Sequence, residues 1–334
     1  MIIFAQKLKI GVDEMTKAIV EVGTREVSTK NFFNGDLLNR WLSFAGVSEK
    51  SASTYKTAIK QLARYFATNA ITAPTREDLE AWRDGLIAGK KSPATIQLYL
   101  CTAKIFFRWL AMEGFYKTNI ADHLKAKVKV NHEHKKDALT AAQAGKLIQG
   151  VNGKSLKSKR DRAVIALMAS TGLRCVEVNR ADVADMIEQF GRTYLLIQGK
   201  GHSSKDSKVL LPAQVVTLIQ DYLQARGNVE GNQPLFTSTA NRNRGARLST
   251  QSISKMIKAN LRAAGFDTPR LTAHSLRHTA ATAMIIAGVE LTQVQQVLRH
   301  VNINTTMLYN NAVNRIKNTA EQTAANAIFD TLSA

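Results

Sequence analysis

Apolar residues recur at helical spacing over most of this chain, and this periodicity constrains it to a mainly helical fold. Tyr55, Ile59, Leu62 and Phe66 are spaced four, three and four residues apart, which places them on one helical face. A similar stripe follows a Ser-Pro pair, with its members at Ile96, Leu100, Ala103, Phe107 and Leu110. Patterns of this kind fill residues 33–121, so we expect a helical domain there.

Helix-start signals divide residues 33–121 into four helices. Asn34 is placed to cap the first helix, with Trp41 and Phe44 facing inward. Thr75 precedes Asp78 by three residues, a variant of the capping box that marks the third helix. Ser92-Pro93 begins the fourth, because proline is favoured at the first helical position. The stretch therefore predicts a four-helix domain.

The second half of the chain predicts helices around a small antiparallel sheet. Short β-branched or apolar runs occupy about 183–187, 193–198 and 208–212, and the glycine-containing segment 199–204 between the last two is typical of a hairpin. Helices are expected at about 159–171, 213–226, 249–264, 272–287 and 290–299, and one more from Tyr309 to about 331. The fold class is thus mainly α with a small antiparallel β-sheet.

The domain boundaries follow from these patterns. Residues 1–30 show little periodicity and predict an N-terminal arm or helix, and residues 31–124 hold the four-helix domain. Residues 125–138 are rich in lysine and lack apolar periodicity, as a linker does. Residues 139–334 form the second domain with a C-terminal helix.

The charge balance points to a polyanion as partner. The 334 residues carry 46 lysines and arginines against 26 acidic residues, a net charge of +20. No run approaches 18 uninterrupted apolar residues, and the N-terminus does not look like a signal peptide. Two cysteines cannot make a disulfide framework. We therefore expect a cytoplasmic, DNA-associated protein without membrane attachment.

One ordered set of side chains has the chemistry needed to cut a phosphodiester without a metal. Two arginines can hold the non-bridging oxygens bidentately, and a tyrosine hydroxyl can attack phosphorus to form a covalent ester. A lysine or histidine can give a proton to the departing sugar oxygen. The candidate catalytic residues are Arg174, Lys200, His274, Arg277, His300 and Tyr309.

Three segments of this set resemble the catalytic motifs of the tyrosine recombinases, or phage integrases. They are Thr171–Glu177, the run His274-Ser275-Leu276-Arg277-His278, and Leu298-Arg299-His300 followed by Tyr309. The resemblance spans about residues 138–312 and extends more weakly back to about residue 33. It implies an N-terminal SAM-like core-binding domain and an α+β catalytic domain. Arg299 departs from the family pattern, which usually has glycine at this position.

The resemblance implies a role for each residue. Arg174, Arg277 and the histidines would hold the phosphate, Tyr309 would form a 3′-phosphotyrosine, and neighbouring groups would ease its attack. Lys200 would be the general acid, with Lys205 and Lys208 as rivals in the same loop. Glu177 would orient Arg174 or its neighbours, or alternatively form a local ion pair with Arg180.

The same resemblance implies a site-specific recombinase that needs no metal, ATP or other cofactor. Its partners would be double-stranded DNA carrying a specific site, three further copies of the chain in a tetramer on two duplexes, and possible accessory DNA-bending proteins. The C-terminal helix, with a stripe at Ile316, Ala320, Ala324 and Ile328, would pack on its own domain or on a neighbouring subunit.

Basic residues outside the motifs are candidates for contacts to the DNA backbone. Lys56, Lys60 and Arg64 follow one helical face away from the apolar stripe, and Lys104 and Arg108 repeat the pattern. A solvated basic face explains such spacing equally well in a protein without these motifs. A second cluster contains Arg242, Arg244, Arg247, Lys255, Lys258 and Arg262.

Four alternative interpretations compete with recombination. A type IB topoisomerase shares the chemistry but reseals the same strand, and a DNA-binding regulator would use the fold without catalysis. A metal-dependent transposase would use Asp182, Asp185 and Glu188, which lie close together in the sequence. A zinc site would use His274, His278 and His300, although the H-E-x-x-H pattern is missing.

Overall fold

The computed structural model describes residues 33–128, 137–199 and 202–330. The chain divides into two compact units, one ending at His132 and the other beginning at Glu133, and each is described by itself. The predicted N-terminal arm and most of the predicted linker lie outside the described residues. Within the described ranges, no helix is long and apolar enough to cross a membrane.

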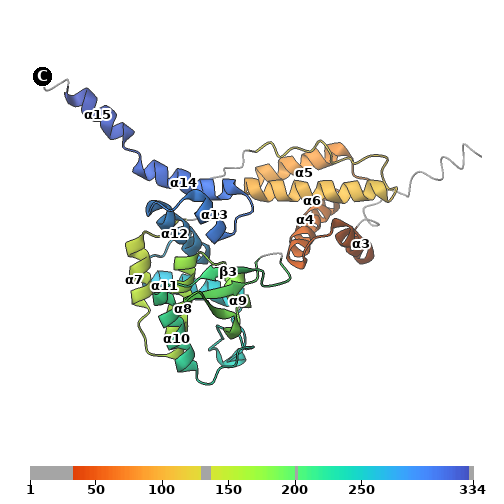
Figure 1. Ribbon diagram of the computed structural model, residues 1–334. Coiled ribbons are helices and arrows are strands. Elements are labelled where there is room, and N and C mark those ends of the chain that lie inside the picture. Colours follow the sequence, from red (N-terminus) through yellow and green to blue (C-terminus); the bar gives the residue numbers. More distant parts are fainter. Residues whose placement is uncertain (1–32, 129–136, 200–201, 331–334) are drawn as a thin grey trace, which may run out of the picture. The chain divides into compact units, whose positions relative to one another are not determined.

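The described part of the first unit consists of four helices, as predicted (Figure 1). They are α3 (Gly35–Ala45), α4 (Glu49–Thr68), α5 (Arg76–Ala88) and α6 (Pro93–Met112). The backbone N–H of Leu37 donates to Oδ1 of Asn34 at 2.7 Å, which confirms the first cap. The Thr75–Asp78 capping box is present, and Pro93 is the first residue of α6. Local capping chemistry therefore determines where these helices begin.

The core of the first unit is aromatic. Trp41, Trp82 and Phe106 are almost completely buried, and the ring of Phe106 meets that of Trp41 edge to face at 5.1 Å. The predicted stripe of α6 is buried throughout. Phe44 was predicted to face inward, but it is 44% exposed. It lies in the last turn of α3, beyond the part of that helix that its neighbours cover.

The second unit combines helices with a three-stranded antiparallel sheet. Its strands, in the order β1-β2-β3, are β1 (Met186–Gln189), β2 (Arg192–Ile197) and β3 (Ser207–Leu210). Leu195 lies opposite both Met186 and Val209. The predicted strand at 183–187 is wrong in its first part. Val183–Asp185 forms the 3-10 turn η1, because the Asp182 backbone N–H donates to the side chain of Asp185 at 2.7 Å.

Helix α8 is at the centre of the second unit. It spans Leu156–Thr171, and Val164, Ile165 and Leu167 are completely buried. It packs against α10 (Ala213–Arg226) and α12 (Ala273–Ile286). The remaining helices before the C-terminal segment are α7 (Ala141–Gly150), α9 (Cys175–Arg180), α11 (Thr250–Ala263) and α13 (Leu291–Leu298), with the 3-10 turn η2 at Asn241–Asn243.

Helix α12 buries different sides along its length. Leu276 and Ala280 are buried, but Ala283 and Ala287 are exposed. The second half of α12 instead buries Ala281 and Ile285, which join a small cluster with residues of α13 and α14. The contact with α13 and α14, which the periodicity of α12 alone does not show, changes the buried side.

The single C-terminal helix predicted after Tyr309 is also wrong. Tyr309 lies inside α14 (Ile303–Lys317), and a separate helix, α15, spans Ala320–Asp330. Asn318 and Thr319 separate the two helices, so the predicted stripe crosses a break. Figure 1 shows α15 projecting from the end of α14, and α15 contains no buried residue.

Candidate active site

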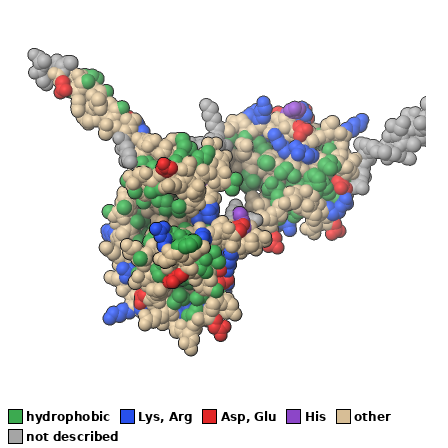
Figure 2. Space-filling view, in the orientation of Figure 1, with side chains coloured by type: hydrophobic (Ala, Val, Ile, Leu, Met, Phe, Trp, Pro, Cys, Tyr) green, Lys and Arg blue, Asp and Glu red, His purple; other side chains and the backbone are tan. Residues whose placement is uncertain are grey.

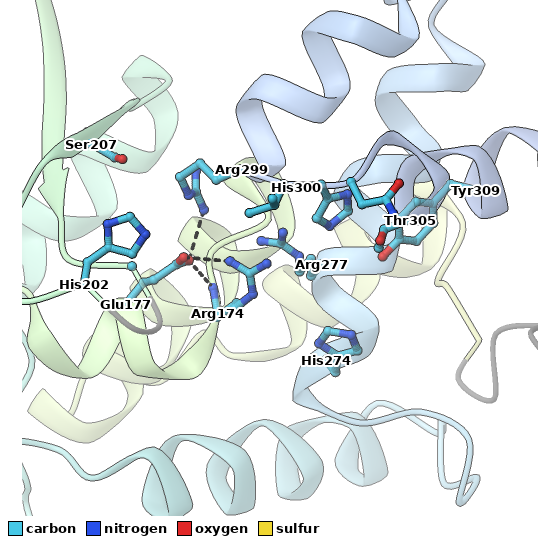
Figure 3. Close-up of a pocket in the computed structure, with 13 residues that line it drawn as sticks. Arg174, Glu177, His202, Ser207, His274, Arg277, Arg299, His300, Thr305 and Tyr309 are labelled. Atoms are coloured by element: carbon cyan, nitrogen blue, oxygen red, sulfur yellow. Dashed lines mark hydrogen bonds and ion pairs between the residues drawn. The ribbon is translucent and has the colours of Figure 1, made fainter. Parts of the chain in front are cut away.

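One pocket of about 700 Å³ in the second unit collects most of the predicted catalytic residues (Figure 3). The residues come from the α8–α9 turn, the β2–β3 hairpin, the start of α12 and the α13–α14 segment. The predicted residues that line it are Arg174, Glu177, His274, Arg277, His300 and Tyr309. Lys200 lies outside the described residues, but its neighbour Gly199 lines the pocket.

A sharp turn between two helices places Arg174. Helix α8 ends at Gly172, which adopts the left-handed conformation with φ +67°, and α9 begins at Cys175. Arg174 is the residue immediately before α9, and its side chain is 30% exposed. The left-handed glycine therefore ends α8 and lets the chain turn so that Arg174 caps the start of α9.

Arg277 is anchored deep in the site. It lies on the first turns of α12 and is 1% exposed. Its Nη1 donates to the carbonyl oxygen of Gly172 at 2.6 Å, and its Nη2 donates to the carbonyl oxygen of Leu298. Burial, together with the nearby positive charge of Arg174, lowers the pKa of Arg277 to about 10, so it stays charged at neutral pH. A guanidinium has five N–H donors, so donors remain for an anion.

Glu177 is shared between two arginines. Its Oε1 accepts from Nη1 of Arg174 at 3.0 Å, and its Oε2 accepts from the Arg174 backbone N–H at 2.7 Å and from Nη2 of Arg299 at 3.0 Å. Burial raises the pKa of this carboxyl, but Arg299, Arg174 and Arg277 outweigh burial and leave the pKa lowered. Arg180, the alternative partner, donates instead to the carbonyl oxygen of Gly199 at 2.8 Å.

The two predicted histidines differ in their surroundings. His274 is exposed on the first turn of α12, and its ring meets that of His278 edge to face at 4.8 Å. His300 is half-buried, and its Nδ1 lies 2.8 Å from Oγ1 of Thr306. The buried Thr306 therefore fixes the orientation of the His300 ring, a role that the sequence analysis missed.

Tyr309 packs between imidazole rings rather than facing solvent. It is 3% exposed, with the His300 ring stacked parallel at 6.1 Å and the His278 ring edge to face at 5.0 Å. Burial raises the pKa of the hydroxyl, and Arg277 and Arg174 offset this only in part. The neighbouring cations therefore do not make this tyrosine more acidic than an ordinary one in this state of the protein.

The hairpin lysines that compete with Lys200 point elsewhere. Nζ of Lys205 lies 2.6 Å from carboxylate oxygens of both Asp182 and Asp185. Nζ of Lys208 donates to the side-chain oxygen of Gln189. Neither lysine lines the pocket, whereas His202 of the same loop does. Asp182 and Asp185, two of the residues considered for a transposase, are thus ion-paired inside the protein.

The alternative zinc site would need at least three side chains grouped as metal ligands. Among the described residues, no three or more His, Cys, Asp or Glu side chains are grouped so that they could hold a metal ion. His274, His278 and Tyr309 instead form a row of edge-to-face ring contacts.

The predicted DNA contacts are mostly on the surface. Figure 2 shows lysine and arginine side chains over the visible faces of both units. The exposed candidates are Lys56, Lys60, Arg64, Arg108, Arg242, Arg244, Arg247 and Lys255, and Lys104 is half-buried. Arg247 differs, because its guanidinium is bound to the Asp182 carboxylate at 2.5 Å and to the Asn179 carbonyl oxygen at 2.9 Å.

Family profiles match both units of the chain. The Phage integrase family matches residues 137–315, and the Phage integrase N-terminal SAM-like domain matches residues 36–114. A tyrosine recombinase of Synechocystis sp. is 29% identical over 278 residues, covering 78% of this chain and 87% of the relative. Tyrosine recombinase XerC of Lactobacillus delbrueckii subsp. bulgaricus is 30% identical over 240 residues, covering 70% of this chain and 77% of the relative.

Solved structures share the fold. XerH site-specific recombinase bound to a palindromic difH substrate superposes with a TM-score of 0.69 at 20% identity, covering 88% of this chain and 84% of that one. A lambda integrase tetramer bound to a Holliday junction gives a TM-score of 0.66 at 20% identity, covering 88% and 80%. With the pocket and both profiles in agreement, the chain belongs to the phage integrase family and is a tyrosine site-specific recombinase.

Proposed function

We propose that this recombinase cuts and rejoins DNA through Tyr309, with the phosphate held by Arg174, Arg277 and the two site histidines. The observation that carries the proposal is that Arg174, Arg277, His300 and Tyr309 line one pocket although they come from three separate parts of the chain. Two guanidinium groups beside one phenol suit an anion that gains charge as it reacts.

The proposed step forms one bond and breaks one. The Tyr309 oxygen attacks phosphorus, and the bond from phosphorus to the 5′ oxygen breaks. The products are a 3′-phosphotyrosine and a free 5′-hydroxyl. Lys200 gives its proton to the 5′ oxygen, and the tyrosine proton leaves through a neighbouring base or water. A partner strand's 5′-hydroxyl then reverses the step. The ester conserves the bond energy, so the exchange has no need of ATP.

The two guanidinium groups have different supports in this proposal. Arg277 is fixed by carbonyl oxygens at the ends of α8 and α13, so its position needs no ligand. Arg174 is more exposed and is held through Glu177. Arg277 is therefore assigned to the inner phosphate oxygen and Arg174 to the outer one. His300 would donate to the phosphate through Nε2, because its Nδ1 faces Thr306.

Domain roles and partners complete the proposal. Residues 31–124 would bind the duplex as the core-binding domain, 125–138 would link the domains, and 139–334 would carry catalysis, with residues 1–30 as an arm or helix. The family profiles at 36–114 and 137–315 support this division. Four copies would act on two duplexes in the cytoplasm, with accessory DNA-bending proteins as further partners. The tetramer of the similar lambda integrase, which is bound to a Holliday junction, supports the number of copies.

A covalent trap tests the chemistry. The protein is mixed with sheared, nicked DNA from its own source in the presence of EDTA and quenched with detergent, and the linked peptide is then mapped. We expect a 3′ adduct on Tyr309, because the proposed attack uses no metal. Sequencing of the attached DNA identifies the site.

Matched tyrosine variants control the trap. Tyr309→Phe keeps the ring contacts and should bind DNA without forming an adduct. Tyr194→Phe, at a half-buried position on β2, should form the adduct normally. An adduct that persists in Tyr309→Phe would contradict the assignment of the nucleophile, and an adduct that EDTA abolishes would contradict the metal-free chemistry.

A further inference from the structure

We infer that Arg299 is a positioning residue of this site, which holds the Glu177 carboxylate from one side so that Glu177 holds Arg174 from the other. The inference rests on the proposed role of Arg174 in binding the phosphate. It concerns a position where the motif that this segment resembles has glycine.

The contacts form a continuous chain from Arg299 to Arg174. Nη2 of Arg299 lies 3.0 Å from Oε2 of Glu177, and Nη1 of Arg174 lies 3.0 Å from Oε1 of the same carboxylate. The Glu177 side chain is 0% exposed, and that of Arg299 is 16% exposed. Figure 3 shows Glu177 between the two guanidinium groups, and Arg299 itself lines the pocket. Charge-assisted hydrogen bonds at buried positions fix side chains more firmly than exposed ones do.

Two features at Arg299 work against stability. It follows α13 in the left-handed conformation, with φ 55° and ψ 49°, which glycine adopts without steric cost and arginine does not. Its Nε is buried and has no hydrogen-bond partner within the described part of the chain. Glycine at this position would remove both costs. Unfavourable backbone kept at a functional site indicates that the side chain serves the site.

The charges around Glu177 support the same role for Arg299. Glu177 faces Arg174 from the α8–α9 turn, Arg277 from α12 and Arg299 from the end of α13, and these arginines lower its pKa against the effect of burial. His202, His274 and His300 line the same pocket. With Arg299 present, the carboxylate stays ionised and the pocket keeps an excess of positive charge for the phosphate.

The sign of the pH effect follows from these contacts. Removal of Arg299 removes the strongest influence that opposes burial, so the pKa of Glu177 rises. A protonated Glu177 accepts the Arg174 hydrogen bond poorly. Glu177 therefore becomes protonated at a higher pH in the variant than in the wild type, and its hydrogen bond with Arg174 is weakened at that higher pH. The acidic limb of the cleavage rate should move to higher pH.

The experiment measures single-turnover adduct formation on site DNA as a function of pH for wild type, Arg299→Gly, Arg299→Lys, Glu177→Gln and the Arg299→Gly/Glu177→Gln double variant. Arg299→Gly should slow cleavage roughly tenfold, the scale of one charge-assisted hydrogen bond. Its acidic limb should shift upward, and Arg299→Lys should restore much of both. The double variant should be no slower than Glu177→Gln alone, because Arg299 acts through Glu177.

A second readout does not depend on cleavage. Inorganic phosphate serves as the probe, and its effect on the thermal unfolding midpoint is compared between the same proteins. The midpoint shift should be smaller in Arg299→Gly than in wild type or Arg299→Lys. Arg299→Asn, which tolerates the left-handed conformation, guards against a folding defect peculiar to glycine.

The outcomes separate the two proposals. Equal rates, unshifted pH profiles and equal phosphate shifts in wild type and Arg299→Gly overturn the role of Arg299. Additive losses in the double variant overturn the path through Glu177. A wild type that forms no adduct counts against the proposed function, and the phosphate shifts then decide about Arg299 by themselves.

Discussion

At the residue scale, Gly172 supports the candidate active site and has no room for a side chain. It combines φ +67° with a backbone so close to α13 that an added Cβ would lie 2.5 Å from Cδ2 of Leu298. Its carbonyl oxygen also receives the Nη1 hydrogen bond of Arg277. One methyl group at this position would therefore disturb the backbone, the packing of Leu298 and the anchor of Arg277 together.

Gly172→Ala is expected to lower the free energy of unfolding by about 2–4 kcal/mol, the sum of left-handed backbone strain and overpacking. Adduct formation should fall as well, because Arg277 loses its anchor. Gly288→Ala is the control, since Gly288 has φ +83° but nothing within 4 Å of an added Cβ. Chemical denaturation measures both variants. If Gly172→Ala lowered the free energy of unfolding no more than Gly288→Ala does, the contact with Leu298 would not contribute to stability.

At the element scale, the β2–β3 hairpin carries the proposed general acid and is tied to the domain by its other residues. Lys205 binds Asp182 and Asp185 beside η1, Arg180 donates to the carbonyl oxygen of Gly199, and Gln198 donates to that of His202 at 2.8 Å. In the sequence, these contacts lie both before and after Lys200. Lys205 is therefore assigned an anchoring role and not a proton-transfer role.

Substrates with a 5′-bridging sulfur separate the two roles. A thiol leaving group, with a pKa near 8.5, departs without the protonation that an alcohol needs, so such DNA should restore cleavage by Lys200→Met. Lys205→Met should be slowed on both substrates, because its loop is loosened. Lys208→Met should cleave both at nearly the wild-type rate. If the sulfur-containing DNA restored cleavage by Lys205→Met to the same degree as cleavage by Lys200→Met, Lys205 would be identified as the acid.

At the scale of the whole molecule, α15 is an exposed helix at the C-terminal end of the described residues. It contains no buried residue, and Ile328 and Phe329 are 61% and 63% exposed. Exposed apolar side chains of this size are typical of an interaction surface. Docking of α15 on a neighbouring subunit of the proposed tetramer is therefore the interpretation to test against packing on its own domain.

The double variant Ile328→Asp/Phe329→Asp should bind one DNA site normally but fail to assemble four copies on two duplexes, because a charged side chain is costly in an apolar interface. Analytical ultracentrifugation with site DNA distinguishes the two complexes. Phe190→Asp, which changes another exposed aromatic residue (90% exposed) in the β1–β2 turn, is the control. Unchanged assembly in the α15 variant would argue for packing within one chain.

The fold class, the starts of α3, α5 and α6, and six residues that line the pocket could be predicted from the sequence alone. Caps at Asn34, Thr75 and Ser92 act within a few residues, so local chemistry is sufficient to place them. Most of the pocket residues lie in short motifs whose spacing is visible in the chain. Lys200 remains a prediction, because it lies outside the described residues.

The neighbours that those residues meet could be seen only in the three-dimensional fold. The buried side of α12, the break between α14 and α15, and the exposure of Phe44 all depend on what packs against each helix. The Glu177–Arg299 contact joins residues 122 positions apart, and Thr306 is recognised only when its hydroxyl meets His300. Periodicity shows that a face is apolar or charged, but its partner is set by three-dimensional packing, which no local pattern encodes.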